Sequence, residues 1–186
     1  MLAATGARKV DVVGHSEGSL MPNYWVKFLD GARRVDDYVG VTPLWDGTNT
    51  AGLATIDQIG SALGLSPVAY DVLEPYCASC HQFLQGSRFI RKMNRGGGPA
   101  VAGVDYTMIM TTNDELVIPY TSGEMEGARN FVVQDECAQD QSEHLSIIYD
   151  PMTAGLIANA LDRRHRRPVP CAVVLPFVGA PGYHGS

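Results

Sequence analysis

Residues 9–18 read K-V-D-V-V-G-H-S-E-G, and the rest of the architecture can be worked out from them. The short β-branched run at 9–13 predicts a strand buried on both faces. A sharp turn follows, and apolar positions at helical spacing predict a helix from Ser19 to about Leu29, ended by Gly31. A serine on a turn between a buried strand and a helix, with a glycine two positions to each side, is the G-x-S-x-G pattern of a nucleophile turn.

The residue types on this turn suit nucleophilic chemistry. Ser16 has to stand on a tight turn if its hydroxyl is to clear the end of the sheet, and the glycines at 14 and 18 let strand and helix approach each other. The start of the helix places the Glu17 N–H beside a developing oxyanion and adds a favourable dipole. We therefore predict Ser16 as the nucleophile and the Glu17 N–H as one oxyanion donor.

A serine nucleophile needs a base and an acid that orients it, and on this kind of turn the acid precedes the histidine in the chain. Asp114 follows a predicted strand at 105–111, at the carboxyl end where catalytic groups gather in parallel sheets. Asp114 is the predicted acid, with Glu115 as its competitor. His144 is the predicted base because it lies on a loop before a predicted helix. His15, inside the turn, is expected to point away from the nucleophile's side.

Strands alternate with helices along the chain, which predicts βαβ units and a mainly parallel sheet of the α/β class. A helix end closed by Gly6 is expected at 1–7, and helical segments are expected around 56–63, 67–73 and 83–93. The further predicted strands are 38–42, 105–111 and 130–134, with 171–177 as a candidate fifth, and a last helix is predicted at 151–161.

Composition excludes several classes of function. Lys plus Arg is 14 and Asp plus Glu is 20, a net charge of −6 that argues against a nucleic-acid partner. The hydrophobic fraction of 45% is enough for a sizeable core in 186 residues, and no apolar run is long enough for a transmembrane segment. The sequence has no H-x-x-E-H cluster and no Gly-rich phosphate loop, so we predict no metal and no cofactor.

Four cysteines leave several chemistries open. Cys77 and Cys80 form a C-A-S-C box that suits a short structural disulfide, while a redox pair, half a zinc site and free thiols are the alternatives. If this box is a disulfide, Cys137 and Cys171 pair by elimination and tie the tail to the last strand. Two structural disulfides imply an oxidising compartment.

Five segments in order along the chain carry a family resemblance. They are V-D-V-V-G-H-S-E-G-S-L-M-P-N-Y-W at 10–25, T-P-L-W-D-G-T-N at 42–49, C-A-S-C-H-Q-F-L-Q-G-S at 77–87, D-Y-T-M-I-M-T-T-N-D-E-L-V-I-P-Y-T-S at 105–122 and E-H-L-S-I-I-Y-D-P at 143–151. Together they resemble the secreted α/β-hydrolase lipases of the class 2 type, and the resemblance runs across nearly the whole chain.

The resemblance implies an α/β-hydrolase fold and a triacylglycerol lipase or esterase that is exported and disulfide-bonded. Carried over residue by residue, Ser16 is the nucleophile, Asp114 the acid and His144 the base of an acyl-enzyme mechanism. Residues 1–186 are then expected to form a single, partial domain, with 44–100 as the cap over an acyl pocket and 163–186 as a C-terminal tail. Leu44 and Trp45 are expected near the pocket mouth. The expected partners are a lipid or ester substrate and a lipid–water interface.

The family resemblance also leads us to expect parts before the first strand. Only fifteen residues precede Ser16, so we expect that the N-terminal strands, the loop with the second oxyanion donor and the secretion signal are missing. The strand before Ser16 would then lie at a sheet edge. Two alternatives follow: an inactive remnant that binds a lipid or a protein, or an acyltransferase that uses the same three residues.

Overall fold

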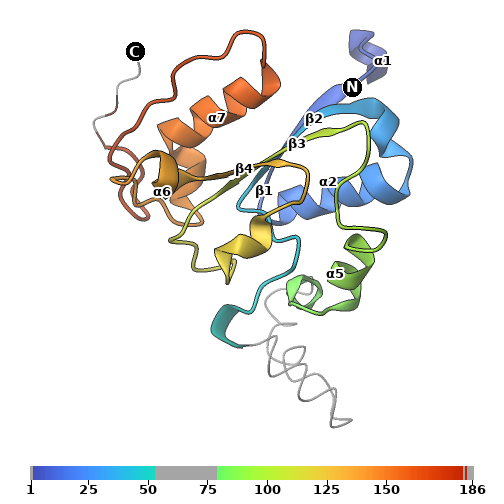
Figure 1. The fold of residues 1–186 in the computed structure, drawn as a ribbon, viewed down its shortest axis with the longest axis horizontal. Helices are drawn as coiled ribbons and strands as arrows, with labels where there is room; N and C mark the ends of the chain where they lie inside the picture. The colour runs from blue at the N-terminus through green and yellow to red at the C-terminus, as the bar shows by residue number, and fades with distance from the viewer. Residues whose placement is uncertain (1, 53–78, 182, 184–186) are drawn as a thin grey trace.

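The computed structural model describes residues 2–52, 79–181 and 183. Its centre is a sheet of four parallel strands in the order β1-β2-β3-β4, flanked by helices (Figure 1). The strands are β1 (Val10–His15), β2 (Val35–Val41), β3 (Asp105–Met110) and β4 (Arg129–Val132). This arrangement confirms the α/β class with a parallel sheet.

Strand β1 is an edge strand among the described residues, because β2 is the one strand that pairs with it there. Its side chains alternate between partly buried and exposed, and Val13 is 49% exposed. The prediction of a strand buried on both faces is therefore wrong for β1. Strands β2 and β3 are buried along most of their length, because helices cover both faces of the sheet there.

Two hydrophobic cores lie on opposite faces of the sheet. On one face, α2 (Glu17–Phe28) and α5 (Arg88–Met93) contribute Leu20, Val26 and Met93 to a cluster with Tyr38 and Met108. On the other face, α7 (Pro151–Leu161) packs on the neighbouring strand residues, which include Val39 and Ile109. The alternation along β2 and β3 thus divides their side chains between two helical layers.

Helices α1 (Leu2–Thr5), α2 and α7 lie where the sequence predicts them, whereas the helical segment predicted at 83–93 is an α-helix only over α5. Helix α7 spans the predicted 151–161, and its N-cap Asp150 accepts backbone hydrogen bonds from Met152 and Thr153. Helix α1 is closed by Gly6 at φ 70°, as expected. Helix α2 begins at Glu17 rather than Ser19. The remaining short helices are η1 (Gly31–Arg34), η2 (Thr50–Gly52), η3 (Cys80–Phe83), η4 (Tyr120–Gly123), α6 (Val133–Glu136) and η5 (Ser146–Tyr149).

The tail does not supply a fifth strand in the described part of the chain. Residues 171–177 form a single antiparallel bridge, between Leu175 and Gly179. The tail instead binds the loop before α7, where the Gln141 N–H donates to the Val174 carbonyl at 3.0 Å. The helices expected around 56–63 and 67–73, and the middle of the predicted cap, lie outside the described residues.

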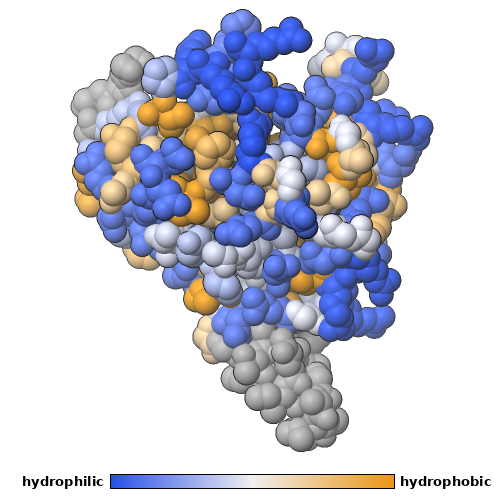
Figure 2. Space-filling model, in the orientation of Figure 1, coloured by the Kyte–Doolittle hydropathy of each residue, from blue (hydrophilic) through white to orange (hydrophobic). Residues whose placement is uncertain are grey.

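The surface is mainly hydrophilic on the face drawn in Figure 2, with hydrophobic residues in separate patches. Within the described ranges, no helix is both long enough and apolar enough to cross a membrane.

Gly14, near the end of β1, lies directly against the start of α2. A Cβ atom at Gly14 would lie 2.1 Å from the Gly18 carbonyl oxygen, so only glycine fits there without movement. A Cβ atom at Gly18 would meet nothing within 4 Å. Of the two glycines in the motif, the first is therefore required by packing and the second is not.

This difference predicts opposite effects of two matched substitutions. Gly14→Ala should lower the free energy of unfolding by more than about 2 kcal/mol, because strand or helix has to move. Gly18→Ala should leave it unchanged or raise it by up to about 1 kcal/mol, since alanine favours the helix. Urea unfolding of both variants measures the difference, and equal stability of the two would contradict the packing argument.

Candidate active site

Ser16 occupies the whole connection between β1 and α2. Its backbone has φ 54° and ψ −124°, a conformation that costs energy for any residue with a side chain. Two hydrogen bonds hold it there: the Ser16 N–H donates to the Val41 carbonyl at 2.9 Å, and the Ser16 carbonyl accepts from the Ser19 N–H at 2.9 Å. The turn is thus anchored both to the neighbouring strand and to the helix that follows.

Asp114 and His144 form a buried pair. The Nδ1–H of His144 donates to the Asp114 carboxylate, with both oxygens at 3.0 Å, and each side chain is 2% exposed. One Asp114 oxygen also accepts the N–H groups of Leu116 at 3.0 Å and Val117 at 2.7 Å. These backbone contacts fix the carboxylate, and the carboxylate in turn leaves Nε2 as the available nitrogen of the imidazole.

His15, the residue before Ser16, connects the nucleophile turn to His144. The His15 Nε2–H donates to the His144 carbonyl at 2.8 Å, and the two ring centroids are 4.8 Å apart. The expectation that His15 points away was wrong, because its ring packs on the base. The Ser16 hydroxyl itself makes no hydrogen bond with another described residue.

Glu115, the competing acid, binds the backbone of the base rather than its ring. Its carboxylate accepts the His144 N–H at 3.2 Å. The sequence favoured Asp114 over Glu115, and Asp114 is the one of the two whose carboxylate contacts the His144 ring.

Glu143 has a role in the site that sequence reasoning missed. Its buried carboxylate accepts the N–H groups of Leu145 at 2.6 Å, Ser146 at 2.9 Å and Phe177 at 2.9 Å. Burial acts to raise the pKa of Glu143, but these hydrogen bonds outweigh it and lower the pKa overall. Glu143 therefore ties the loop that carries His144 to the C-terminal tail. The sequence signal was a charged residue directly before the base.

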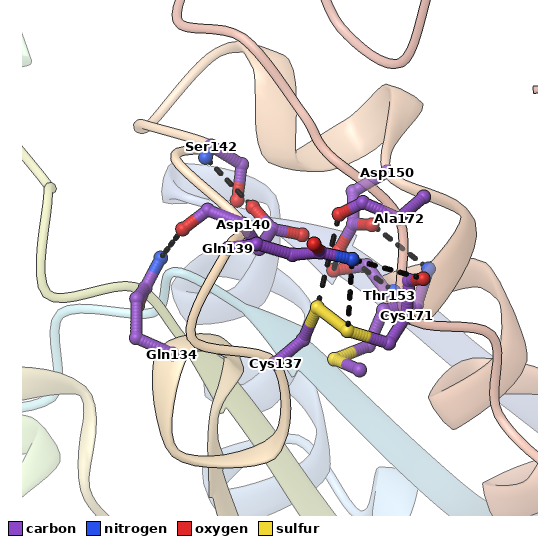
Figure 3. The surroundings of a disulfide bond; sticks show 10 residues. Gln134, Cys137, Gln139, Asp140, Ser142, Asp150, Thr153, Cys171 and Ala172 are labelled. Atoms are coloured by element: carbon purple, nitrogen blue, oxygen red, sulfur yellow. Dashed lines mark hydrogen bonds between the residues drawn. A yellow bond between two sulfur atoms is a disulfide. The ribbon is translucent and has the colours of Figure 1, made fainter. Parts of the chain in front are cut away.

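A disulfide between Cys137 and Cys171 ties the same tail to the end of α6 (Figure 3). The pairing predicted by elimination is confirmed. Gln139 adds a hydrogen bond from its side-chain amide to the Cys171 carbonyl at 3.4 Å. Cys80 is also disulfide-bonded, whereas Cys77 lies outside the described residues.

An apolar cavity of about 340 Å³ opens beside the turn. Ser16 and Glu17 line one side of it, and the other lining residues are Leu44, Thr48, Thr50, Cys80, Phe83, Leu84, Leu116 and Val117. Leu44 lies where the resemblance implied. Trp45 does not line the cavity: it is buried in the core with Nε1 at 3.0 Å from the Met108 sulfur. The first N–H groups of α2, including that of Glu17, have no partner within the helix.

Asp140 and Asp150 bring two carboxyl groups together near the loop that carries His144, the base loop (Figure 3). Burial raises the pKa of Asp140 to about 6, and the neighbouring Asp150 adds to this rise. Hydrogen bonds from Ser142 oppose it, including one from the Ser142 N–H at 2.7 Å. Near neutral pH, Asp140 is thus ionised at an energetic cost.

This cost predicts a pH-dependent effect of Asp140→Asn. The folded chain keeps a proton on Asp140 that the unfolded chain loses near pH 3.8, so stability falls as the pH rises from about 4 to about 6. Asp140→Asn should remove that fall. The substitution should therefore change the free energy of unfolding more favourably at pH 8 than at pH 4, by on the order of 2 kcal/mol. Urea unfolding at both pH values checks this, with Asp135→Asn at an exposed position as the control. If Asp140→Asn lowered the free energy of unfolding equally at the two pH values, the result would contradict the prediction.

Comparison with known proteins bears on this geometry. The model of the family described as "Lipase (class 2)" matches residues 1–155. The solved structure of Aspergillus fumigatus lipase B is similar, with a TM-score of 0.65 and 26% identity over 87% of this chain and 38% of that one. Bacillus licheniformis lipase BlEst2 shares the fold, with a TM-score of 0.50 and 12% identity over 70% of this chain and 59% of that one.

No curated protein matches the chain by sequence. The chain spans less than two thirds of the length of either similar lipase. The family match nevertheless covers most of the chain and includes the nucleophile turn, Asp114 and His144. This chain belongs to the class 2 lipase family and has the α/β-hydrolase fold.

Proposed function

We propose that this chain carries the catalytic residues of a carboxylic ester hydrolase of the triacylglycerol lipase or esterase type. The observation that carries the proposal is the buried His144–Asp114 pair, held against the turn that presents Ser16. Ser16 is the nucleophile, His144 the base and Asp114 the acid that orients the base. The apolar cavity beside Ser16 suits the acyl chain of the ester.

In the first half of the reaction, the Ser16 Oγ attacks the ester carbonyl carbon and its proton moves to the His144 Nε2. The carbonyl oxygen becomes an oxyanion, and the Glu17 N–H at the start of α2 donates to it. When the tetrahedral intermediate collapses, the bond to the alcohol oxygen breaks. That oxygen takes the proton from His144, the alcohol leaves and an acyl-enzyme remains.

In the second half, His144 takes a proton from water while the water oxygen attacks the acyl carbon. Collapse returns this proton to the Ser16 Oγ and releases the carboxylic acid. Asp114 keeps its charge throughout, because its role is to fix the imidazole and stabilise the imidazolium that forms.

Three further parts complete the proposal. Residues 1–186 belong to a single, partial hydrolase domain, in which 44–100 is the cap and 163–186 the tail. The protein is exported, which the Cys137–Cys171 disulfide favours. Large apolar side chains of the base loop and the tail are exposed and suit a lipid–water interface; they are Leu145, Ile148, Tyr149, Phe177 and Val178.

The proposal predicts which serine and histidine matter for hydrolysis. Ser16→Ala and His144→Ala should each lower kcat/KM on p-nitrophenyl butyrate by about 10⁴-fold or more, since they remove the nucleophile and its base. His165→Ala is the matched control. His165 also contacts an aspartate, Asp162, at 3.0 Å, but its side chain is 78% exposed, so its loss should leave the rate unchanged. Equal rates for Ser16→Ala and the unmodified chain would refute the proposal.

A further inference from the structure

His15 makes the direct contact between the nucleophile turn and the base. It is the last residue of β1, covalently joined to Ser16, and its Nε2–H reaches the His144 carbonyl across 129 positions of sequence. The two rings are 4.8 Å apart at an angle of 51°. The Ser16 hydroxyl has no hydrogen-bond partner among the described residues, so the His15 hydrogen bond is a direct link between the turn and the base in the resting state.

We propose that His15 is a positioning residue of the hydrolase: its ring, protonated at Nε2, holds the base in register with the nucleophile. This inference rests on the proposed function of Ser16 and His144, and it goes beyond it because His15 touches neither substrate nor reacting atoms.

Three contacts from two segments then hold the base. Asp114 holds the ring at Nδ1, Glu115 holds the backbone N–H and His15 holds the backbone carbonyl. The first two come from the loop after β3, so alone they would set His144 relative to the acid only. His15 is the contact that relates the base to the turn at the end of β1.

The chemistry of the contact decides which nitrogen of His15 carries a proton. A carbonyl oxygen only accepts hydrogen bonds, so Nε2 must carry one, and a neutral His15 can make the contact in the Nε2–H tautomer alone. Burial lowers the pKa of His15; the charged groups that face it are those of His144, Asp114 and Glu143. A neutral His15 also avoids placing a second positive charge beside the imidazolium that forms on His144 during acyl transfer.

Three variants separate positioning from general structural support. His15→Phe keeps an aromatic ring but removes the donor, and His15→Gln restores a side-chain N–H donor. His15→Phe should lower kcat by about 10- to 100-fold with KM within about 2-fold, because a small misplacement of the base costs rate rather than binding. His15→Gln should recover most of the loss, and His165→Phe, at an exposed position, should match the unmodified chain.

A second measurement does not depend on activity, and its first part needs no variant. Nitrogen-15 NMR of histidine-labelled protein reports the tautomer of neutral His15, which should be protonated at Nε2. The low-field proton shared by His144 and Asp114 should be sharp in the unmodified chain and in His15→Gln, and broadened in His15→Phe.

The outcomes separate this inference from the proposed function. A neutral His15 protonated at Nδ1, or a His15→Phe variant with unchanged kcat and an unchanged low-field proton, would overturn the positioning role even if Ser16 is the nucleophile. A chain that hydrolyses no ester but shows the Nε2–H tautomer and the broadened proton would keep the positioning role and refute the hydrolase. If His15→Phe does not fold, the tautomer in the unmodified chain decides.

Discussion

The structure depends on the contact between Gly14 and the Gly18 carbonyl, which makes a one-residue connection between β1 and α2 sterically possible. Because the strand and the helix are that close, Ser16 is forced to a positive φ and stands at the end of the sheet. The strain is balanced by hydrogen bonds to Val41 and Ser19 and by the packing of Leu20 in the core. The position of the serine is therefore a consequence of strand–helix packing, not of contacts made by its own hydroxyl.

The base is positioned in a different way, through many contacts to a loop that has no regular structure. Asp114 and His15 reach His144 from the ends of two strands, and Glu143 fixes the loop to the tail. The disulfide to Cys171 then anchors that tail to α6. Cross-links of this kind reduce the freedom of a loop that would otherwise sample many conformations, which is what an oriented imidazole requires.

Sequence reasoning worked where local chemistry determines the structure. The parallel sheet, helix α7 and the Cys137–Cys171 pair followed from periodicity and cysteine count. It failed where the outcome depends on distant neighbours. The exposure of the Val13 side chain depends on which segments pack beside β1. The direction of the His15 ring depends on the loop that carries His144, far along the chain. The tail was apolar enough for a strand but is held by Glu143 and the disulfide instead.

The central claim is that Ser16 is a nucleophile activated by His144. It is tested most directly by treating the protein with a fluorophosphonate and locating the adduct by mass spectrometry of the tryptic peptide at residues 10–27. The account predicts a single adduct on Ser16 in the unmodified chain and loss of that adduct in His144→Ala. An adduct on another residue, or equal labelling of Ser16 in both chains, would contradict it.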